Sequence, residues 1–453
     1  MVENVRGRCR ALQYQLAACY FEAVDAGHNE QHARINYPLL AVLILALVVR
    51  LGWALSRSID EQALESLPDQ REYLALGRNL IESRNLSFTD SRFSDVVYAF
   101  RTPGYPMMIA MCGGSPRMVR GAQALVDTST CLAVYLLARR WLSRDASVFA
   151  ALVCALHPFL IYFCGLILTE TIFTAMLAWG LVLLMTTVTR WWIGGGVLLA
   201  LAVLVRPGAI AMPVVLGVLA AVANPKQAKP YQRWSLPVGT TMLLITLAVL
   251  LPWALRNSRV VGQWVWTSTN SGFTAYDGFN PDASGASDQS FVKDMPQLRR
   301  MTEAGRSEYL AEKAKSFMRE NPQRVLELAV VKIGRTWSPR PLSAEFSKPL
   351  YVAVAYAFAG PVYLLALFGL SYRTLPRMAK LLLLAPAIYL TVSAAMSVGS
   401  LRYRVPAEPY IAILAAAGAE MIVRRLMERP AFVRVAVESE EGSGSADENA
   451  ARS

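Results

Sequence analysis

The chain has 453 residues, of which 54% are hydrophobic and only 17% are charged. Soluble globular proteins carry about 25% charged residues, so this composition and a mean hydropathy of +0.34 indicate a membrane protein with several spans rather than a soluble domain. The net charge of +12 does not indicate nucleic-acid binding, because the basic residues fall mostly between apolar runs, where they set orientation in a bilayer.

Ten apolar runs are candidates to cross a bilayer, which takes about 17–25 residues. We expect spans near residues 38–55, 118–140, 146–164, 167–189, 192–206, 208–223, 236–255, 350–371, 379–398 and 405–423. The fifth and sixth are short and meet at "VRPG". The apolar piece "YPMMIAMCGG" from Tyr105 is too short to cross alone, so we expect a re-entrant or interfacial helix there.

Lysine and arginine accumulate in the short connections on one side of these spans, which the positive-inside tendency assigns to the cytoplasm. This distribution predicts a cytoplasmic N-terminal segment, a membrane domain with two long outer loops, and a cytoplasmic tail that is acidic and disordered at its end. The respective residues are 1–37, 38–425 with outer loops 56–117 and 256–349, and 426–453.

The segment "LPDQREYLALGRNL" from Leu67 carries the first candidate site residue. Pro68 suits the first position of a helix, which puts Asp69 in the first turn. A carboxylate there caps free amides and complements the helix dipole. Alternatively, Asp69 and Tyr73 share a helix face directed at a reaction centre. The residue types alone favour capping.

Charges also lie at or inside the predicted spans. Arg101 heads the turn "RTPGYP" and either snorkels to lipid headgroups or pairs with an anion at the membrane surface. Glu170 begins the fourth span and Asp127 lies inside the second. Acidic residues in spans are costly and usually face a cavity or a partner, so we expect a partner or a cavity for each.

Four arginines stand at three span ends on the predicted outer side, against the positive-inside tendency. They are Arg206 in "VRPG", Arg256 in "PWALRN", and Arg402 and Arg404 in "LRYRVP". One or two such residues are common, but four indicate a shared anion.

Six pieces of the chain, taken in order from residue 68 to about residue 418, resemble bacterial GT-C glycosyltransferases of family 39, the protein O-mannosyltransferase-like group that includes lipid A aminoarabinose transferases. The pieces are "PDQREYLALGRNL", "RTPGYP", "ALHPFLIYFCGLILTETIF", "LAVLVRP", "PWALRNSRVVGQWVWTSTNSGFTAYDGFNPDASG" and "LRYRVPAEPYIAILAAAG". Their common order makes the resemblance specific.

The resemblance implies an all-α polytopic membrane fold of about ten helices with loop helices on the outer face. It also implies transfer of a sugar from a polyprenyl-phosphate carrier to a lipid, glycan or protein acceptor. Asp69 aligns with the family's acidic residue, which favours catalysis over capping. Several relatives carry a second acid where Phe100 and Arg101 stand here. This departure argues against a divalent metal ion without excluding one.

On this interpretation Asp69 is the general base of an inverting displacement, and arginines stabilise the charge that grows on the lipid phosphate. The expected substrate-binding residues are Tyr73, Arg101, Tyr105, Glu170, Arg206, Arg256, Asn257, Arg402, Tyr403 and Arg404. We expect an integral protein of the bacterial inner membrane with its site on the outer face, no certain cofactor and no nucleic-acid partner.

Two other functions remain open at this point. A secondary transporter would also have ten spans and buried charges, but it predicts an internal repeat and broken helices at mid-membrane; no clear repeat is visible. A degenerate, non-catalytic GT-C scaffold is the second alternative, and the missing second acid keeps it open.

Overall fold

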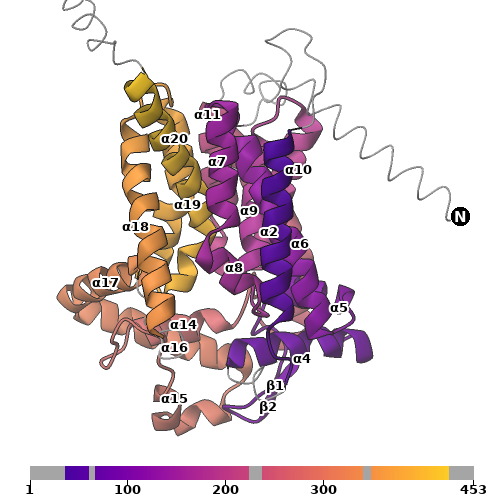
Figure 1. The fold of residues 1–453 in the computed structure, drawn as a ribbon. Coiled ribbons are helices and arrows are strands. Elements are labelled where there is room, and N and C mark those ends of the chain that lie inside the picture. Colours follow the sequence, from indigo (N-terminus) through magenta and orange to yellow (C-terminus); the bar gives the residue numbers. More distant parts are fainter. Residues whose placement is uncertain (1–35, 61–66, 224–236, 340–347, 428–453) are drawn as a thin grey trace, which may run out of the picture.

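The computed structural model describes residues 36–60, 67–223, 237–339 and 348–427. All but two residues of the predicted cytoplasmic N-terminal segment and all but two of the predicted cytoplasmic tail lie outside these ranges. The described chain is mainly helical, with one antiparallel pair of short strands, β1 (Phe88–Asp90) and β2 (Asp95–Val97). An upright bundle of helices stands over a second group of helices, which gather at one end of it (Figure 1). We call this end the loop end.

The bundle helices coincide with the ten predicted spans, the third span being made of two helices. They are α2 (Tyr37–Leu55), α6 (Pro116–Ala138), α7 (Arg144–Ala155), α8 (Pro158–Cys164), α9 (Glu170–Leu184), α10 (Thr189–Val203), α11 (Met212–Ala223), α13 (Val238–Val261), α18 (Pro349–Ser371), α19 (Arg377–Ala395) and α20 (Glu408–Met427). The predicted all-α polytopic architecture is therefore confirmed.

Length and apolar composition qualify five of the described helices to cross a membrane alone: α2, α6, α13, α18 and α19. The α7–α8 pair qualifies as a sixth span and is bent by 51° at its break. Helices α9, α10 and α11 are apolar but shorter. Helix α20 is buried along most of its length and carries Glu408 and Glu420, so it lies inside the bundle rather than against lipid.

The loop end holds two short helices from the first long loop and four from the second. They are α4 (Pro68–Glu82), α5 (Gly104–Met111), α14 (Asn270–Gly278), α15 (Phe291–Asp294), α16 (Glu303–Glu320) and α17 (Pro322–Trp337). The helix that was expected to start at Pro68 is confirmed. A helix is also present in the segment from Tyr105, as expected. Helices α16 and α17 are separate, because Pro322 lacks an amide donor and begins α17.

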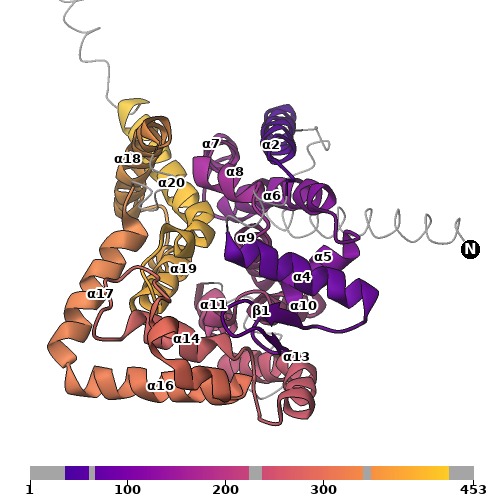
Figure 2. The same ribbon diagram turned by 90° about the horizontal axis from the view of Figure 1, so that it is seen from below.

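Two apolar cores hold these layers together. The larger runs through the bundle from α2 to α20. The smaller joins the two loops, and its aromatic members include Phe100 and Phe273, whose rings meet edge to face at 5.6 Å between centroids. Seen from below, α4 lies across the span ends while α16 and α17 run along two sides (Figure 2). The second core therefore fixes the second loop onto the first.

A buried ion pair braces the broken span. Arg50 on α2 contacts Asp127 on α6 at 2.6 Å, and both side chains are almost fully buried. Arg50 also donates to the carbonyl oxygens of Cys154 and Ala155, next to the break between α7 and α8. The expected partner of Asp127 is thus present, and the same guanidinium satisfies carbonyls that the break leaves free.

Helices α18 and α20 approach so closely that only glycine fits at the crossing. A Cβ atom at Gly369 would overlap the carbonyl oxygen of Leu414, and one at Gly418 would overlap that of Leu365. Small residues at such crossings let helix backbones pack closely in membranes.

We expect Gly369→Ala to destabilise the protein by about 1–3 kcal/mol, because the added methyl group forces the two helices apart. Gly360→Ala is the matched control, since Gly360 lies on the same helix with open space around its Cβ position. Thermal unfolding of the two purified variants in one detergent checks this. Equal midpoints for the two variants would contradict the close crossing.

Candidate functional site

Asp69 lies at the centre of the site, held by arginines from two distant segments. It occupies the first turn of α4. Arg101, from the turn after β2, donates to Oδ1 of Asp69 at 2.6 Å. Arg402, from the short helix η4 (Leu401–Tyr403) between α19 and α20, donates to Oδ2 at 2.8 Å. One carboxylate therefore joins the first loop to the last part of the bundle.

The ion pairs continue on both sides of Asp69. Glu72, one helical turn further along α4, contacts Arg101 at 2.6 Å. Glu170, fully buried at the start of α9, contacts Arg402 at 2.7 Å and Arg206 at 3.2 Å. Three carboxylates and three guanidinium groups alternate in this series of ion pairs, which we call the charge network. Glu170 therefore has the partner that the sequence predicted, in the form of two arginines.

Aromatic rings pack against the guanidinium groups of the network. Arg101 lies over the ring of Tyr73 at 5.2 Å from its centroid, and Tyr73 meets Tyr105 edge to face. The Tyr105 hydroxyl donates to Oε1 of Gln123 on α6 at 2.5 Å. Arg206 lies over the ring of Tyr403 at 5.3 Å. These contacts fix the guanidinium groups in place and attach them to the bundle.

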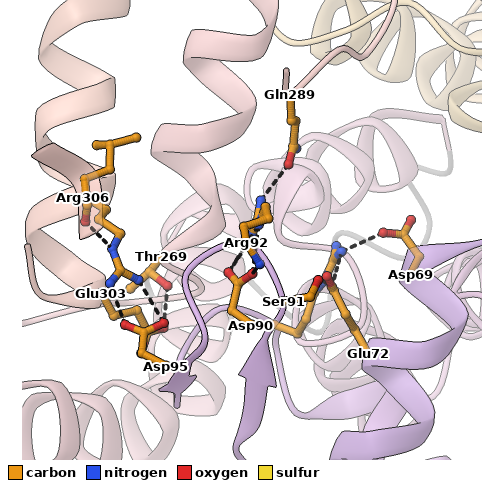
Figure 3. A network of polar contacts seen from close by, with 12 residues as sticks. Asp69, Glu72, Asp90, Ser91, Arg92, Asp95, Thr269, Gln289, Glu303 and Arg306 are labelled. Carbon is orange, nitrogen blue, oxygen red and sulfur yellow. Dashed lines mark hydrogen bonds and ion pairs between the residues drawn. The ribbon is translucent and has the colours of Figure 1, made fainter. Parts of the chain in front are cut away.

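A cavity of about 420 Å³ opens beside the network. Asp69, Glu72, Arg101 and Arg402 line one part of it. The rest of the lining is partly apolar, and its polar side chains come from both loops: Arg71, Ser91, Arg92, Asn270, Ser287 and Gln289. Figure 3 shows Asp69 and Glu72 beside Ser91, Asp90 and Arg92, with Gln289 reaching in from the second loop. A volume of this size accommodates a small organic ligand.

The second loop is tied to the turn that carries Arg101. Glu303, at the start of α16, accepts hydrogen bonds from the backbone amides of Tyr98 and Ala99 and from the hydroxyl of Thr269. Arg92 donates to both Asp90 and Gln289. The wall of the cavity therefore depends on contacts between the two loops.

The electrostatic surroundings keep Asp69 ionised. Burial alone would raise the pKa of the Asp69 carboxyl, but Arg101 and Arg402 outweigh it and hold the pKa well below its usual range. Burial raises the pKa of the Tyr73 hydroxyl, with Arg101 opposing that change and Asp69 adding to it. Asp69 thus stands as a carboxylate and Tyr73 as a neutral hydroxyl.

Three of the residues predicted from sequence belong neither to the charge network nor to the aromatic rings that support it. Arg256 donates to the carbonyl oxygens of Tyr98 and Leu86, and Asn257 donates to that of Val265. Arg404 is fully buried, 3.0 Å from Glu408. The structure therefore gives Arg256 and Arg404 partners within the protein, and neither is among the residues that line the cavity.

Other cavity residues were not predicted from the sequence. Glu72 could have been found, because it stands three residues after Asp69 and shares its helix face. Arg92, Asn270 and Gln289 could not, since they belong to irregular segments whose meeting depends on the docking of the two loops. The Oδ1 atom of Asn270 is buried at the cavity wall without a hydrogen-bond partner in the described structure.

The donor groups at this site do not suit a divalent metal ion. No group of three His, Cys, Asp or Glu side chains placed to hold a metal ion occurs among the described residues. Asp69 and Glu72 are both engaged by Arg101, so a cation would have to displace a guanidinium group. Asp95, the nearest acid upstream of the proline-rich turn, pairs with Arg306 instead.

The arrangement resembles solved membrane proteins. AglB, the oligosaccharyltransferase of Archaeoglobus fulgidus, solved with an inhibitory peptide and a dolichol-phosphate, matches with 14% identity over 89% of this chain and 52% of its own, at a TM-score of 0.54. Its apo form matches with 15% identity over 90% of this chain and 53% of its own, at a TM-score of 0.53.

The chain has the GT-C fold. It spans about half the length of the AglB chain that it matches. Residues 106–255 also match the sequence model of the family described as dolichyl-phosphate-mannose-protein mannosyltransferase. ArnT from Cupriavidus metallidurans, solved with undecaprenyl phosphate, matches with 16% identity over 86% of this chain and 79% of its own, at a TM-score of 0.38. No curated protein sequence matches significantly.

The charge network makes stability depend on pH. A carboxyl whose folded pKa is depressed stabilises the protein above its unfolded pKa of about 3.9, and this contribution is lost as the pH falls toward the folded pKa. We expect Asp69→Asn to lower the thermal unfolding midpoint at pH 7. The gap between the two unfolding midpoints should begin to narrow below about pH 5, and part of it should remain at pH 3.

Unfolding midpoints of both proteins in one detergent, measured between pH 7 and pH 3, test this expectation. Asp294→Asn is the control, because Asp294 is exposed at the end of α15. A difference between Asp69→Asn and wild type that stays constant over this range would show that Asp69 is not held ionised by its arginines.

Proposed function

We propose that this chain is a glycosyltransferase that moves a sugar from a polyprenyl-phosphate carrier to an acceptor at the loop end of the bundle. One observation carries the proposal: a carboxylate and two guanidinium groups meet beside a cavity at the loop end of a GT-C bundle. The family match over residues 106–255 and the dolichol-phosphate named with AglB support a donor of this class.

The reaction requires two charge movements. The acceptor oxygen forms a bond to the anomeric carbon while the bond from that carbon to the phosphate oxygen breaks, which inverts the anomeric centre. The phosphate leaves with the bonding electron pair and gains negative charge, which nearby guanidinium groups stabilise. The acceptor hydroxyl gives its proton to Asp69.

Arg101 and Arg402 are placed to stabilise the charge on the leaving phosphate, because both line the cavity. Each is already neutralised by carboxylates, so a lipid phosphate must compete with Asp69 for them. Engagement of the phosphate would loosen both hydrogen bonds to Asp69 and raise the pKa of that carboxyl. In this scheme Asp69 becomes an effective base only when the donor is bound, since a strongly paired carboxylate accepts protons poorly.

The remaining residues position these groups. Glu170 orients Arg402 and Arg206 through its two ion pairs, and the edge-to-face rings of Tyr73 and Tyr105 support Arg101. The ring of Tyr403 supports Arg206 in the same way.

The bonds of Arg256 and Asn257 to loop carbonyls suit bracing of the first loop rather than direct contact with substrate. Arg404 would likewise act through the packing of α20. The polar far side of the cavity, with Asn270 and Gln289, would take the acceptor or the sugar hydroxyls. We place the site on the outer face of the bacterial inner membrane, with both termini in the cytoplasm.

Asp69→Asn should abolish transfer while leaving inserted protein, because the amide cannot accept the proton. A panel of radiolabelled polyprenyl-phosphate sugars, incubated with membranes that contain equal amounts of each protein, measures it. Asp294→Asn should transfer as wild type does. Near-wild-type turnover by Asp69→Asn would end the base role and return Asp69 to helix capping.

Arg402→Ala should lower turnover per folded molecule by about 10²–10³-fold, the usual effect of removing one preorganised group that stabilises developing charge. Arg402→Lys should fall between, because the charge stays and the bidentate fork is lost. Arg404→Lys is the contrasting variant, and it should reduce the amount of folded protein more than the turnover per molecule. Loss of turnover at Arg404 alone would move the phosphate site away from Arg402.

A further inference from the structure

A second pair of arginines lies at the loop end, apart from the charge network. Arg57 follows the end of α2 by two residues, and Arg120 stands in the second turn of α6. Arg120 is only 3% exposed, and Arg57 is half-buried. The two positive side chains are near enough to repel each other. Burying like charges together is costly unless an anion compensates them.

The contacts of this pair are all uncharged. Arg120 donates through Nη1 to the carbonyl oxygens of Arg57 and Ser58, at 3.0 and 2.9 Å. The guanidinium group of Arg57 stacks on the indole of Trp53, 3.9 Å from its centroid. The Nε atoms of both arginines are buried without an acceptor in the described structure. Arg120 makes its two hydrogen bonds through Nη1, so its Nη2 group and the Nη groups of Arg57 are the donors left for a further ligand.

Comparison with the other buried arginines shows how unusual this is. Four arginines are buried within the described residues. Three have a carboxylate: Arg50 pairs with Asp127, Arg306 with Asp95 and Arg404 with Glu408. Arg120 has none among the described residues. Asp60, the described acid nearest in sequence to Arg57, accepts the hydroxyl of Ser58 instead. Within the part of the chain that the structure describes, the pair therefore lacks the anion that its burial calls for.

The position of the pair identifies the source of that anion. Helix α2 is a candidate span with exposed apolar side chains along its length, among them Ile44, Val48 and Leu55. Arg57 comes directly after this exposed apolar stretch. A membrane-crossing α2 would bring Arg57 to the depth of the lipid phosphate groups, and Trp53 is the kind of residue that marks this interface. Guanidinium groups bind phosphate oxygens in a fork.

We propose that Arg57 and Arg120 form a binding site for the phosphate group of a membrane lipid, separate from the cavity beside Asp69. The site does not rest on the proposed transfer reaction. It is nevertheless connected to the aromatic rings that support Arg101. Gln123, three residues after Arg120 on α6, accepts from the Tyr105 hydroxyl and donates to the carbonyl oxygens of Cys164 and Leu166. A bound lipid phosphate would therefore steady the joint between α2, α6 and the first loop.

The test uses the full chain, delipidated in a neutral detergent. Phosphatidylglycerol, a lipid with one anionic phosphodiester, is titrated while bound lipid is counted by native mass spectrometry and the unfolding midpoint is recorded. Wild type should retain phosphatidylglycerol and gain stability. Arg57→Gln should bind this lipid at least tenfold more weakly, and Arg57→Lys should fall between. Arg117→Gln, at an exposed position of the same helix as Arg120, should behave as wild type.

Two further titrations separate the sources of the effect. Inorganic phosphate tests for a site that takes the free ion, and monoolein, an uncharged lipid, tests for simple filling of an apolar surface. The proposal is overturned if either reproduces the gain from phosphatidylglycerol at equal concentration, or if Arg57→Gln binds the lipid as wild type does. The Arg57 variants decide the outcome, because Arg120 also holds two backbone carbonyls and its replacement can disturb folding.

Discussion

The hydrogen-bonded ion pairs between Asp69 and the guanidinium groups of Arg101 and Arg402 are the constraint on which the site depends. They join a helix near the start of the chain to a short turn 333 residues later. In a low-dielectric setting such pairs are stable only when every charge is matched. The network meets that condition with Glu72, Glu170 and Arg206. Its geometry then decides where the cavity opens and which residues line it.

Charge matching also explains why a carboxylate with a depressed pKa can stand at a candidate catalytic position. The pairing that lowers the pKa of Asp69 in the free protein is the pairing that an incoming phosphate would disturb. One set of arginines thus serves two anions in turn. The second arginine pair, Arg57 and Arg120, follows the same electrostatic rule, but there the described chain supplies only the positive side.

The sequence was informative where chemistry and periodicity coincide in a short stretch. The spans followed from apolar runs, the start of α4 from Pro68, and the need for partners at Asp127 and Glu170 from the cost of burying a charge. The family resemblance then singled out Asp69. These steps use local signals, and the structure brings Asp69, Arg101, Glu170, Arg206 and Arg402 into one network.

The rest could not be derived because it depends on docking. Arg402 and Arg404 are two residues apart, yet one lines the cavity and the other is buried against Glu408. The orientation of η4 decides between them, and no periodicity in "LRYRVP" sets that orientation. Likewise, Asn270 and Gln289 reach the cavity only because the aromatic core between the two loops holds them there.

The order of the network along the chain has a consequence for biogenesis. As the chain emerges from the ribosome, Asp69, Glu72 and Arg101 appear together, and Glu170 and Arg206 follow. Each early carboxylate therefore has an arginine partner before the later spans are synthesised. Glu170 is thus not left as an unpaired charge inside the nascent bundle. Arg402 arrives last and links the two early groups. Assembly of the site is therefore completed by the closing segment of the chain, and a product truncated before residue 402 would hold two separate ion clusters instead of one.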